Sequence, residues 1–528
     1  MPSVEKMLGA LPVLAEYCHR LDLAGIIDRA CPIRTDVAIL THGQVIEALV
    51  ANRLSAPTPL LHVTDWARAW AVEETFDIPP DALNDDRIAR ALDAIAPELD
   101  KITGSVGAQA ITAFGIDVSR LHWDMTSISL YGAYPQTDSE FATPRFGHPK
   151  DRRPDLKQVQ AGLAVSGDGG IPVFHHAYDG GAGEVNQVIP AMTALQTMAA
   201  PRKFLLVGDS KLISYGNMAD MIAARVEFIA PASKTYVPAP VLATLDIDTA
   251  TDVDYVAERD IGTPVHERGR WRVTEDTMTL AGPRKADPVV SVRRVFVHST
   301  ARAQAAQVTR AKKLDRARDE LDRVVRGLGS RHYPSEAAVT ERITAISRTR
   351  RVMSYLNAEV GTDPDTGKPT LVWSFDQTAI DAEAATDGWY ALLTTLPATV
   401  SAGEVLVRYK GQEVVERRYS AFKGPLAVAP MFLKTNRRIA ALITVICLAL
   451  LIFCLIERAV RAAIEPAEKM PGLVPGQKAK PTGRLVLQAL GGLRLIPAVA
   501  GQSAVIPQPT PLQARLLDLL AVDPTQPP

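Results

Sequence analysis

The sequence predicts an α/β protein with a separate helical domain in its N-terminal part. Apolar residues recur at three- and four-residue spacing over the first hundred residues, which is the pattern of amphipathic helices. From residue 116 onwards, short apolar segments are separated by turns, and a helical segment stands between two of them. Strand, hairpin, helix and strand in this order are typical of a mixed sheet covered by helices.

The composition limits the class of protein. The 528 residues carry 58 basic and 59 acidic side chains, so the formal net charge is −1, and 47% of the residues are hydrophobic. At roughly 150 residues per domain, three to four structural units are expected, and wholesale disorder or a fibrous repeat is excluded. The four cysteines form no CxxC pair, which favours a reducing compartment over a disulfide scaffold or zinc ribbon. The near-zero charge argues against a nucleic-acid coat protein but does not bear on a local basic groove.

Residues 1–112 are expected to form the helical domain. Thr41 and Gln44 fit a capping box ahead of the apolar segment 45–54, and Asn84 is placed to cap the helix that follows it. Short helices joined by turns suit either a DNA-binding module or a plain helical bundle. The sequence leaves both alternatives open because it shows no recognition-helix signature.

Residues 113–235 are expected to form the first part of a sheet. A buried strand leads into Asp124 and is expected to end there, and the apolar segment 203–209 is a second short strand that ends at Asp209. Between them, residues 159–165 and 171–175 alternate in polarity on either side of a glycine-rich turn, which predicts a hairpin.

The pattern changes in the second half of the chain. Residues 236–395 predict exposed strands and a charged helix, in which residues 301–329 hold eight basic and four acidic side chains. Such a helix is either a solvated face or an interaction surface. Residues 396–465 return to helical spacing, and residues 466–528 form a Pro/Gly-rich tail that is expected to be peripheral.

The uncharged segment 439–456 is 18 residues long, the lower limit for crossing a bilayer. Two interpretations are possible, a membrane span or a fully buried core helix. The core helix is favoured because a single span would separate two large polar regions of the chain.

Asp124 and Asp209 are the first candidates for a functional site. They are 85 residues apart, and neighbouring strands of one sheet would bring both carboxylates to the same edge. Hard divalent cations such as Mg²⁺ prefer carboxylate oxygens, so converging acids suit a metal site. The alternative is that each aspartate is an ordinary cap or turn residue.

A third acid, Glu416, follows Tyr409 and precedes Lys423 by seven residues each. On one continuous helix these three side chains would fall within about 40° of one another. Basic residues surround that face, which suits a metal-binding carboxylate among phosphate contacts or a solvent-facing helix with charge pairs. The basic residues are Arg408, Lys410, Arg417 and Arg418.

These segments together resemble the bacterial insertion-sequence transposases of the DDE class with a Tyr-Arg-Glu-Lys signature. The resemblance rests on WDMTS around Asp124, GHPKDRRPDLKQVQAGL at 147–163, LLVGDSK around Asp209, and the spacing of Tyr409, Glu416 and Lys423. It runs through most of the chain. Gln412 stands where the family has arginine, so one expected phosphate contact is missing or is supplied by a neighbour such as Arg408.

The resemblance implies a ribonuclease-H-like mixed-sheet core in two parts, 113–235 and 396–465. The 207 residues between Asp209 and Glu416 would then include a strand-rich insertion domain at 236–395. The segment 439–456 would be a core helix behind the catalytic one, with no membrane partner. The N-terminal helices would form a domain of their own.

The resemblance also implies a mechanism of DNA cleavage and strand transfer at transposon ends. Asp124, Asp209 and Glu416 would be the catalytic residues and would hold two Mg²⁺ ions, for which Mn²⁺ can substitute. The implied partners are terminal inverted repeats, target DNA and a second copy of the chain, in the bacterial cytoplasm and on the nucleoid. The expected DNA-binding residues are Tyr409, Lys423, Arg408 and Arg417, with Arg152, Arg153 and Lys157 of the basic block 145–157 as a second strip.

Other functions are less well supported by the sequence. Gly208-Asp209-Ser210 resembles the nucleophile block of a serine esterase family, but none of the ten histidines has an aspartate three residues before it. A catalytically inactive, DNA-binding derivative of a transposase is a further alternative. His148, His175 and His176 are expected to be structural or solvent-facing and not zinc ligands, since adjacent strand residues face opposite ways. The glycines at 180–183 lack the Gly-Lys-Ser/Thr of a P-loop.

Overall fold

The fold is described from a computed structural model. It describes residues 5–34, 36, 38–134, 138–200, 202–257, 260–428, 431, 433–465, 468–498 and 504–526. The chain divides into two compact units: unit 1 comprises Met1–Phe228 and Lys410–Pro528, and unit 2 is Ile229–Tyr409. The inserted unit is therefore somewhat longer than the predicted 236–395.

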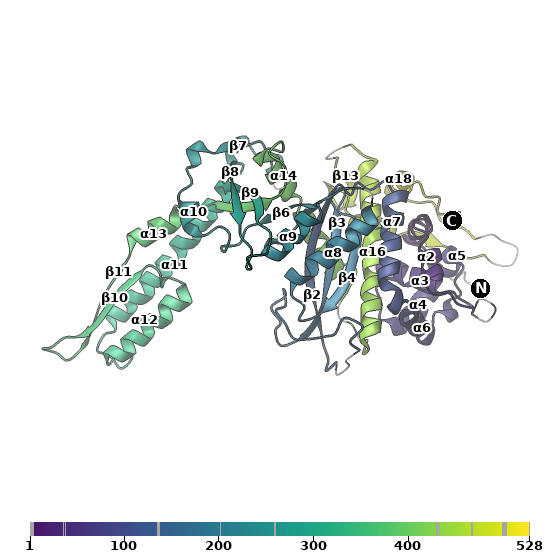
Figure 1. Ribbon diagram of the computed structural model, residues 1–528. Coiled ribbons are helices and arrows are strands. Elements are labelled where there is room, and N and C mark those ends of the chain that lie inside the picture. Colours follow the sequence, from purple (N-terminus) through teal and green to yellow (C-terminus); the bar gives the residue numbers. More distant parts are fainter. Residues whose placement is uncertain are drawn as a thin grey trace. The chain divides into compact units, whose positions relative to one another are not determined.

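The N-terminal part of unit 1 is helical, as predicted (Figure 1). Both predicted caps are present. The Thr41 hydroxyl accepts from the Gln44 amide at 3.1 Å while the Gln44 side chain accepts from the Thr41 amide, and the Asn84 side chain accepts from the Arg87 amide at 2.9 Å. The helices are α1 (Leu11–Arg20), α2 (Leu23–Ala30), α3 (His42–Ser55), α4 (Val63–Ala69), α5 (Val72–Phe76), α6 (Asp85–Ile95) and α7 (Leu99–Ala113).

The sheet of unit 1 follows directly, in the strand order β4–β3–β2–β5. Strands β2, β3 and β4 are antiparallel neighbours, and β5 is parallel to β2. The predicted hairpin is β3 and β4, with its turn at residues 167–170. The elements are β2 (Arg120–Leu130), β3 (Lys157–Ser166), β4 (Pro172–Asp179), α8 (Glu184–Ala199), β5 (Leu205–Val207) and α9 (Tyr215–Ala223).

The prediction that the first strand ends at Asp124 is wrong. Strand β2 continues to Leu130, because residues 125–130 keep pairing with β3 as far as the partners Leu130 and Lys157. Asp124 therefore lies in the middle of the strand. The pairing with β5 is much shorter and ends at His122 and Val207, so beyond His122 one edge of β2 has no strand beside it in the described part of unit 1.

Helix α16 (Asn436–Ala462) forms the centre of unit 1. It packs between β4 of the sheet and α3 and α6 of the N-terminal helices (Figure 1). Among the described residues it is the one helix long and apolar enough to cross a membrane, and its most apolar 18-residue window is 100% buried inside the protein. The prediction that segment 439–456 is a buried core helix is confirmed.

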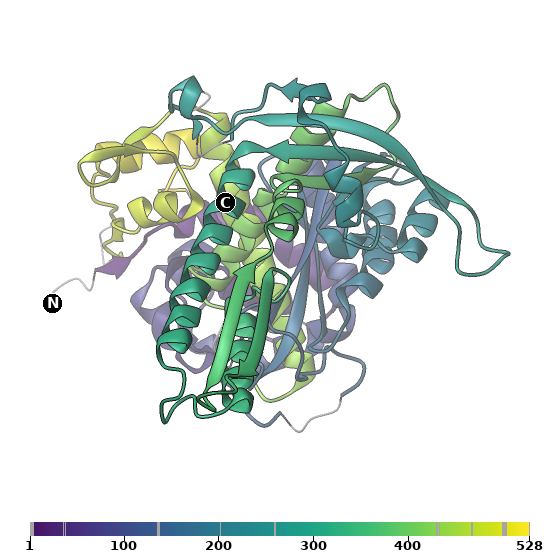
Figure 2. The ribbon, with the colours of Figure 1, turned by 90° about the vertical axis from the view of Figure 1, so that its left-hand side faces the viewer.

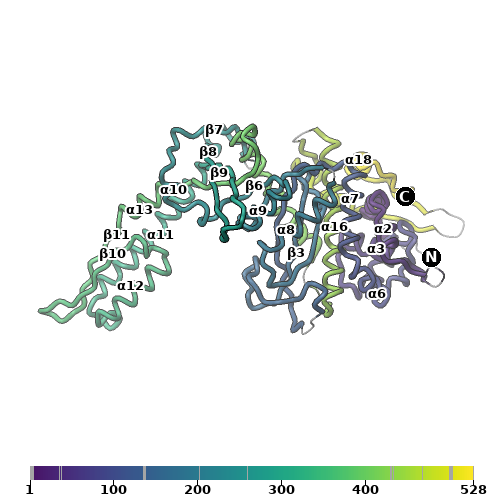
Figure 3. The backbone as a smooth tube through the Cα atoms, viewed as in Figure 1, coloured from purple at the N-terminus to yellow at the C-terminus, as the bar shows by residue number. Residues whose placement is uncertain are grey.

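The prediction of a peripheral C-terminal tail is wrong. Helices α17 (Gly483–Leu490) and α18 (Pro511–Leu520) pack on α16 and on each other, and they bury Val486, Leu490 and Leu516. Strand β15 (Arg494–Leu495) pairs with β1 (Lys6–Met7), so both end regions of the chain fold into unit 1 (Figure 3). The other strands here are β13 (Met470–Val474) and β14 (Gln477–Ala479).

Unit 2 combines a sheet with a helical hairpin. Its strand order is β6–β12–β9–β8–β7. Its elements are β6 (Glu227–Pro231), which starts at the boundary, α10 (Ala239–Ala243), β7 (Thr251–Val253), β8 (Trp271–Leu280), β9 (Val290–Ser299), α11 (Thr300–Arg326), α12 (Glu336–Arg350), β10 (Leu356–Thr362), β11 (Pro369–Phe375), α13 (Gln377–Ala384), β12 (Trp389–Thr394) and α14 (Ala402–Lys410).

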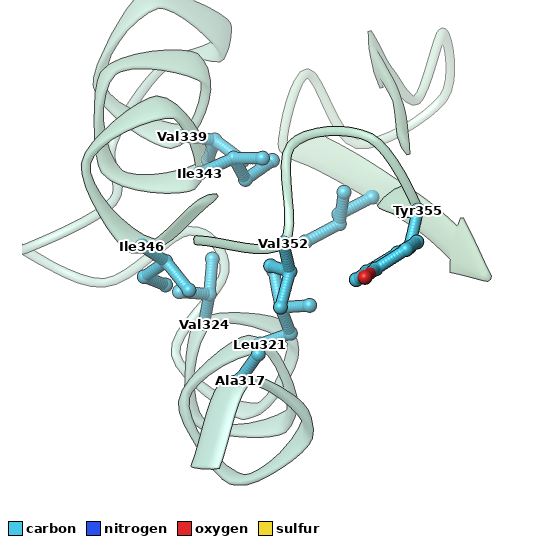
Figure 4. Close-up of a cluster of buried hydrophobic side chains, with 9 residues drawn as sticks. Ala317, Leu321, Val324, Val339, Ile343, Ile346, Val352 and Tyr355 are labelled. Atoms are coloured by element: carbon cyan, nitrogen blue, oxygen red, sulfur yellow. The ribbon is translucent and has the colours of Figure 1, made fainter. Parts of the chain in front are cut away.

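The helical hairpin has a small core of its own. Leu321 and Val324 of α11 meet Val339 and Ile346 of α12 in one buried cluster, which also includes Tyr355 (Figure 4). The two-stranded sheet of β10 and β11 lies beside these helices (Figure 2). The predicted strands and charged helix of the insertion are thus present, with apolar residues at helical spacing facing inward.

Candidate functional site

The side chain of Asp124 is the most unusual carboxylate of the sheet. It projects from the middle of β2 and is only 14% exposed. Desolvation raises its pKa to about 6, and the nearby charge of Asp209 acts in the same direction. The ammonium group of Lys150 opposes this shift but does not cancel it. Asp124 is therefore a buried carboxylate whose negative charge is incompletely compensated.

Asp209 lies on the neighbouring strand connection. Strand β5 ends at Val207, and the Asp209 side chain caps the short 3-10 helix Ser210–Leu212 by accepting from the Lys211 amide at 2.8 Å. The prediction that it directly ends a strand is thus off by two residues. Because β5 runs parallel to β2, this position brings Asp209 within electrostatic reach of Asp124.

Lys150 connects these two acids to a third carboxylate. Its Nζ lies 3.0 Å from Asp124 Oδ1 and 3.7 Å from Glu184 Oε1, and it also donates to the carbonyl oxygen of Met125. Asp209 contributes to the field on the same ammonium group. Glu184 is the first residue of α8. Three carboxylates from different elements therefore share the field of one lysine.

Two residues of the returning chain bind along β2. Gln412 donates from Nε2 to the carbonyl oxygen of Trp123 at 3.2 Å, and its Oε1 lies 3.1 Å from His122 Nδ1. The Tyr419 hydroxyl lies 2.6 Å from the carbonyl oxygen of Asp124 and 3.1 Å from that of Ala161. Gln412, which replaces the arginine of the transposase signature, is thus a partner of the strand that carries Asp124.

The prediction of one helix through Tyr409, Glu416 and Lys423 is wrong. Helix α14 ends at Lys410, and a new helix, α15 (Glu413–Lys423), begins after a turn at Gly411 and Gln412. Glycine is a poor helix former, which explains a break at this point. Tyr409 and Arg408 belong to unit 2, while Glu416 and Lys423 still share one face of α15 in unit 1.

The structure does not place the Glu416 carboxylate against the two aspartates. Glu416 is exposed, and its side chain makes no hydrogen bond or ion pair within the described residues. In the same part of the chain, no three His, Cys, Asp or Glu side chains lie close enough together to hold one ion. Lys423 does approach the site: burial lowers its pKa, and Asp151 and Asp124 act to raise it.

The basic residues near Glu416 differ in environment. Arg417 is exposed, but Arg418 is buried and is not a surface contact. Its guanidinium donates to the carbonyl oxygens of Gly169 and Gly170 and forms an ion pair with Glu457 at 3.1 Å. Arg418 therefore fixes α15 to the β3–β4 turn and to α16.

The predicted basic strip at 145–157 is only partly available to a ligand. Arg152 is exposed in the left-handed backbone region, with φ of 60°. Arg153 is paired with Asp155 at 2.6 Å, and Lys157 donates to the carbonyl oxygens of Ala133 and Tyr134. Lys150, which also belongs to this strip, points into the acidic site.

The three histidines either have structural partners or face solvent. His175 is buried with its Nε2 3.2 Å from the Thr103 hydroxyl, His176 is paired with Asp100 at 2.9 Å, and His148 is exposed. Burial lowers the pKa of His175 to about 3, so its ring is neutral.

Sequence reasoning missed Lys150, Glu184 and Tyr419 as site residues. In the sequence, Lys150 is only one charge of the basic block 145–157. It precedes β3, which pairs with β2, and from there its side chain reaches Asp124 on β2. Glu184 begins a helix after a glycine-rich turn, a position where an acid is an ordinary favourable residue. Neither position carries a local signal for the site.

Comparisons with known proteins give two similarities. Residues 3–102 match the family model described as domain of unknown function DUF4277, which corresponds to the N-terminal helices. The chain also resembles a solved structure, the piggyBac transposase synaptic complex with hairpin DNA, at 10% identity and a TM-score of 0.38 over 90% of this chain and 79% of that chain. No curated protein matches the chain. At that TM-score the resemblance does not establish a shared fold, and the function has to be inferred from the residues of the site.

Proposed function

We propose that this protein is a DNA transposase of the DDE class, with Asp124, Asp209 and Glu416 as its catalytic acids. The observation that carries the proposal is the meeting of Asp124 and Asp209. They come from the parallel strands β2 and β5 and share the field of Lys150, although they are far apart in sequence. Asp124 is nearly buried, and a charge in such a place is costly unless it serves a site.

The arrangement of strands supports a ribonuclease-H-like core. In the order β4–β3–β2–β5, the first acid is on the first core strand and the second acid follows the fourth. Helix α15, which carries Glu416, is attached to the strand of Asp124 through Tyr419. The insertion of unit 2 between Asp209 and α15 agrees with the two-part core that the transposase resemblance implies.

The donor set fits a hard divalent cation. Asp124 and Asp209 offer carboxylate oxygens, the donors that such cations prefer, and burial raises the pKa of Asp124 to about 6. These two residues would hold the ion, with Glu416 as the third ligand of the proposed set. The bound Mg²⁺ ions would activate water and stabilise the leaving oxygen of a phosphodiester.

The chain's own basic groups would bind and orient DNA beside the acids. Lys423 stands at the end of α15 near Asp124, and exposed Arg152 and Arg417 can contact phosphates in solution. For Tyr409 and Arg408, which belong to unit 2, DNA contact is proposed from the spacing of the transposase signature alone. The DNA partners would be the ends of a mobile element and its target, bound by two copies of the chain.

The test is cleavage and strand transfer on DNA that carries the sequences flanking the gene. We expect the purified protein with Mg²⁺ or Mn²⁺ to nick and join these ends, and Asp124→Asn, Asp209→Asn and Glu416→Gln each to reduce the rate by about 100-fold or more. Glu413→Gln is the matched control, since Glu413 is an exposed acid on the same helix.

Two results would contradict the proposal. Full activity in Asp124→Asn would remove the catalytic assignment. DNA binding without any cleavage by the wild-type protein would favour the inactive DNA-binding derivative. The serine esterase alternative receives no support from the structure, because no hydrogen bond joins Ser210 to a histidine among the described residues.

A further inference from the structure

Lys150 occupies an unusual place for a lysine of a surface segment. Its side chain is 42% exposed, yet its ammonium group lies 3.0 Å from the nearly buried Asp124 carboxylate and 3.7 Å from Glu184. The same group also donates to the carbonyl oxygen of Met125. The ammonium group therefore makes two hydrogen bonds, to Asp124 and to the Met125 carbonyl, and a longer ion pair with Glu184.

The backbone around Lys150 is built to deliver this side chain. The Lys150 amide donates to the Ser127 hydroxyl at 2.8 Å, and the Ser129 hydroxyl donates to the Asp151 carboxylate at 2.5 Å. Both serines belong to the part of β2 that lies beyond its pairing with β5. The segment that carries Lys150 is therefore fixed along β2, and its ammonium group meets the acids at a defined position.

A divalent cation at Asp124 would bind the carboxylate whose Oδ1 Lys150 now contacts, so the cation and the ammonium group would lie close together. Two positive groups within a few ångströms of each other repel strongly in a partly buried site. We propose that Lys150 is the resident counter-ion of the Asp124 site, and that a divalent cation binds there by displacing its ammonium group. This inference rests on the proposed function, because it concerns the ion that the proposed reaction requires.

The competing explanation is that Lys150 only holds its own segment against β2. The two explanations differ in what removal of the charge does. If Lys150 competes with the ion, a neutral side chain raises the affinity for the ion, since the coupling between two ligands of one site is reciprocal. If Lys150 is only structural, its removal leaves that affinity unchanged or lowers it.

The first experiment titrates the full-length protein with Mn²⁺ alone and measures free Mn²⁺ by electron paramagnetic resonance. We expect Lys150→Met to lower the Kd by about tenfold or more relative to the wild type. Lys150→Arg keeps the positive charge and should bind as weakly as the wild type. Lys157→Met is the matched control, because Lys157 donates to main-chain carbonyl oxygens of residues 133 and 134 and makes no ion pair with the acids within the described part of the chain. Lys150→Gln is the second neutral variant, should the methionine variant fail to fold.

The second experiment uses the wild-type protein and follows acylation of individual lysines by mass spectrometry. Displacement of the ammonium group should increase the rate of Lys150 modification when Mn²⁺ is added, with no change at Lys157. Asp124→Asn should abolish the Mn²⁺ effect.

The outcomes separate this inference from the proposed function. Equal Mn²⁺ affinity in the wild type and both neutral variants, lost in Asp124→Asn, would overturn the role of Lys150 and leave the metal site in place. Failure of every variant to bind Mn²⁺ would overturn both. A tighter Kd in the neutral variants, together with faster Lys150 acylation in wild type with Mn²⁺, would support the displacement.

Discussion

The hydroxyl of Tyr419 donates to the main-chain carbonyl oxygen of Asp124 at a distance of 2.6 Å. This contact attaches helix α15 to strand β2 at the residue whose side chain faces Lys150. Tyr419 is buried, and its pKa is raised well above the ordinary value, chiefly by desolvation, so the hydroxyl keeps its proton for this bond. The position of Glu416, one turn earlier on α15, therefore depends on Tyr419.

Tyr419→Phe should remove this link with little change in shape. We expect the free energy of unfolding to fall by about 1–2 kcal/mol, because a buried carbonyl oxygen loses a hydrogen-bond donor. Urea denaturation measures this change. Tyr134→Phe is the control, since its hydroxyl donates to the Met431 carbonyl at 3.2 Å from a less buried place and should lose less. An equal loss in both variants would show that the Tyr419 hydrogen bond contributes no more to the free energy of unfolding than the Tyr134 hydrogen bond does.

Arg418→Met should destabilise unit 1 strongly. The substitution leaves Glu457 buried with a weaker set of partners and frees two carbonyl oxygens of the β3–β4 turn, and breaking such a buried pair typically costs about 3–5 kcal/mol. The adjacent Arg417→Met, at an exposed position, should change the free energy of unfolding by less than about 0.5 kcal/mol. Thermal and urea denaturation of the two variants give the comparison, and similar losses would contradict the assignment of Arg418 to the core.

Glu47 should make the stability of the protein depend on pH. Burial raises its pKa from 4.5 to about 7, aided by the charges of Asp28 and Asp22 and opposed by a hydrogen bond from the Ala24 amide. A carboxyl group whose folded pKa is raised favours folding fully below pH 4.5, and this contribution is lost as the pH rises through 7.

Glu47→Gln removes this ionisation. Relative to the wild type, its free energy of unfolding should rise between pH 4.5 and 8 by up to about 3 kcal/mol, as follows from the size of the pKa shift. Chemical denaturation across this pH range measures the difference. For Glu73→Gln, at an exposed position, the free energy of unfolding should change with pH in the same way as that of the wild type. A difference in the free energy of unfolding between Glu47→Gln and the wild type that does not change with pH would contradict the prediction.

Leu321→Ala should destabilise the helical hairpin of unit 2. Leu321 is fully buried in the cluster between α11 and α12, and such truncations typically lower the free energy of unfolding by about 2–5 kcal/mol. Val325→Ala, on the same helix but 39% exposed, is the control and should change it by less than about 1 kcal/mol. Hydrogen exchange of α11 and α12 reports the effect locally. Unchanged exchange in Leu321→Ala would show that this cluster does not hold the hairpin together.

Local signals explain which parts of the fold could be predicted from the sequence. The capping box at Thr41 and the glycine-rich turn at 167–170 are formed by neighbouring residues, so they were predicted correctly. The length of β2 and the break at Gly411 depend on pairing and packing with distant segments, so those two predictions were wrong.

The site itself was only partly predictable, for the same reason. Asp124 and Asp209 stand beside apolar strands, which is visible in the sequence. Lys150 contacts Asp124 and Glu184 only once the segment before β3 and the start of α8 have folded against β2. The spacing of these residues in the sequence does not predict the contacts of Lys150.

The position of α16 has a consequence for how the protein is made. This helix joins the sheet and the N-terminal helices, but its first residue is added only after the preceding 435 residues have been synthesised. Until then, the surfaces of α3, α6 and β4 that α16 covers remain exposed. All of unit 2 is synthesised before the second part of unit 1, so unit 2 can form its core first. Unit 1 can complete its core only after residues 410–528 have been made. We therefore expect a chain truncated before residue 436 to expose these apolar surfaces and to aggregate.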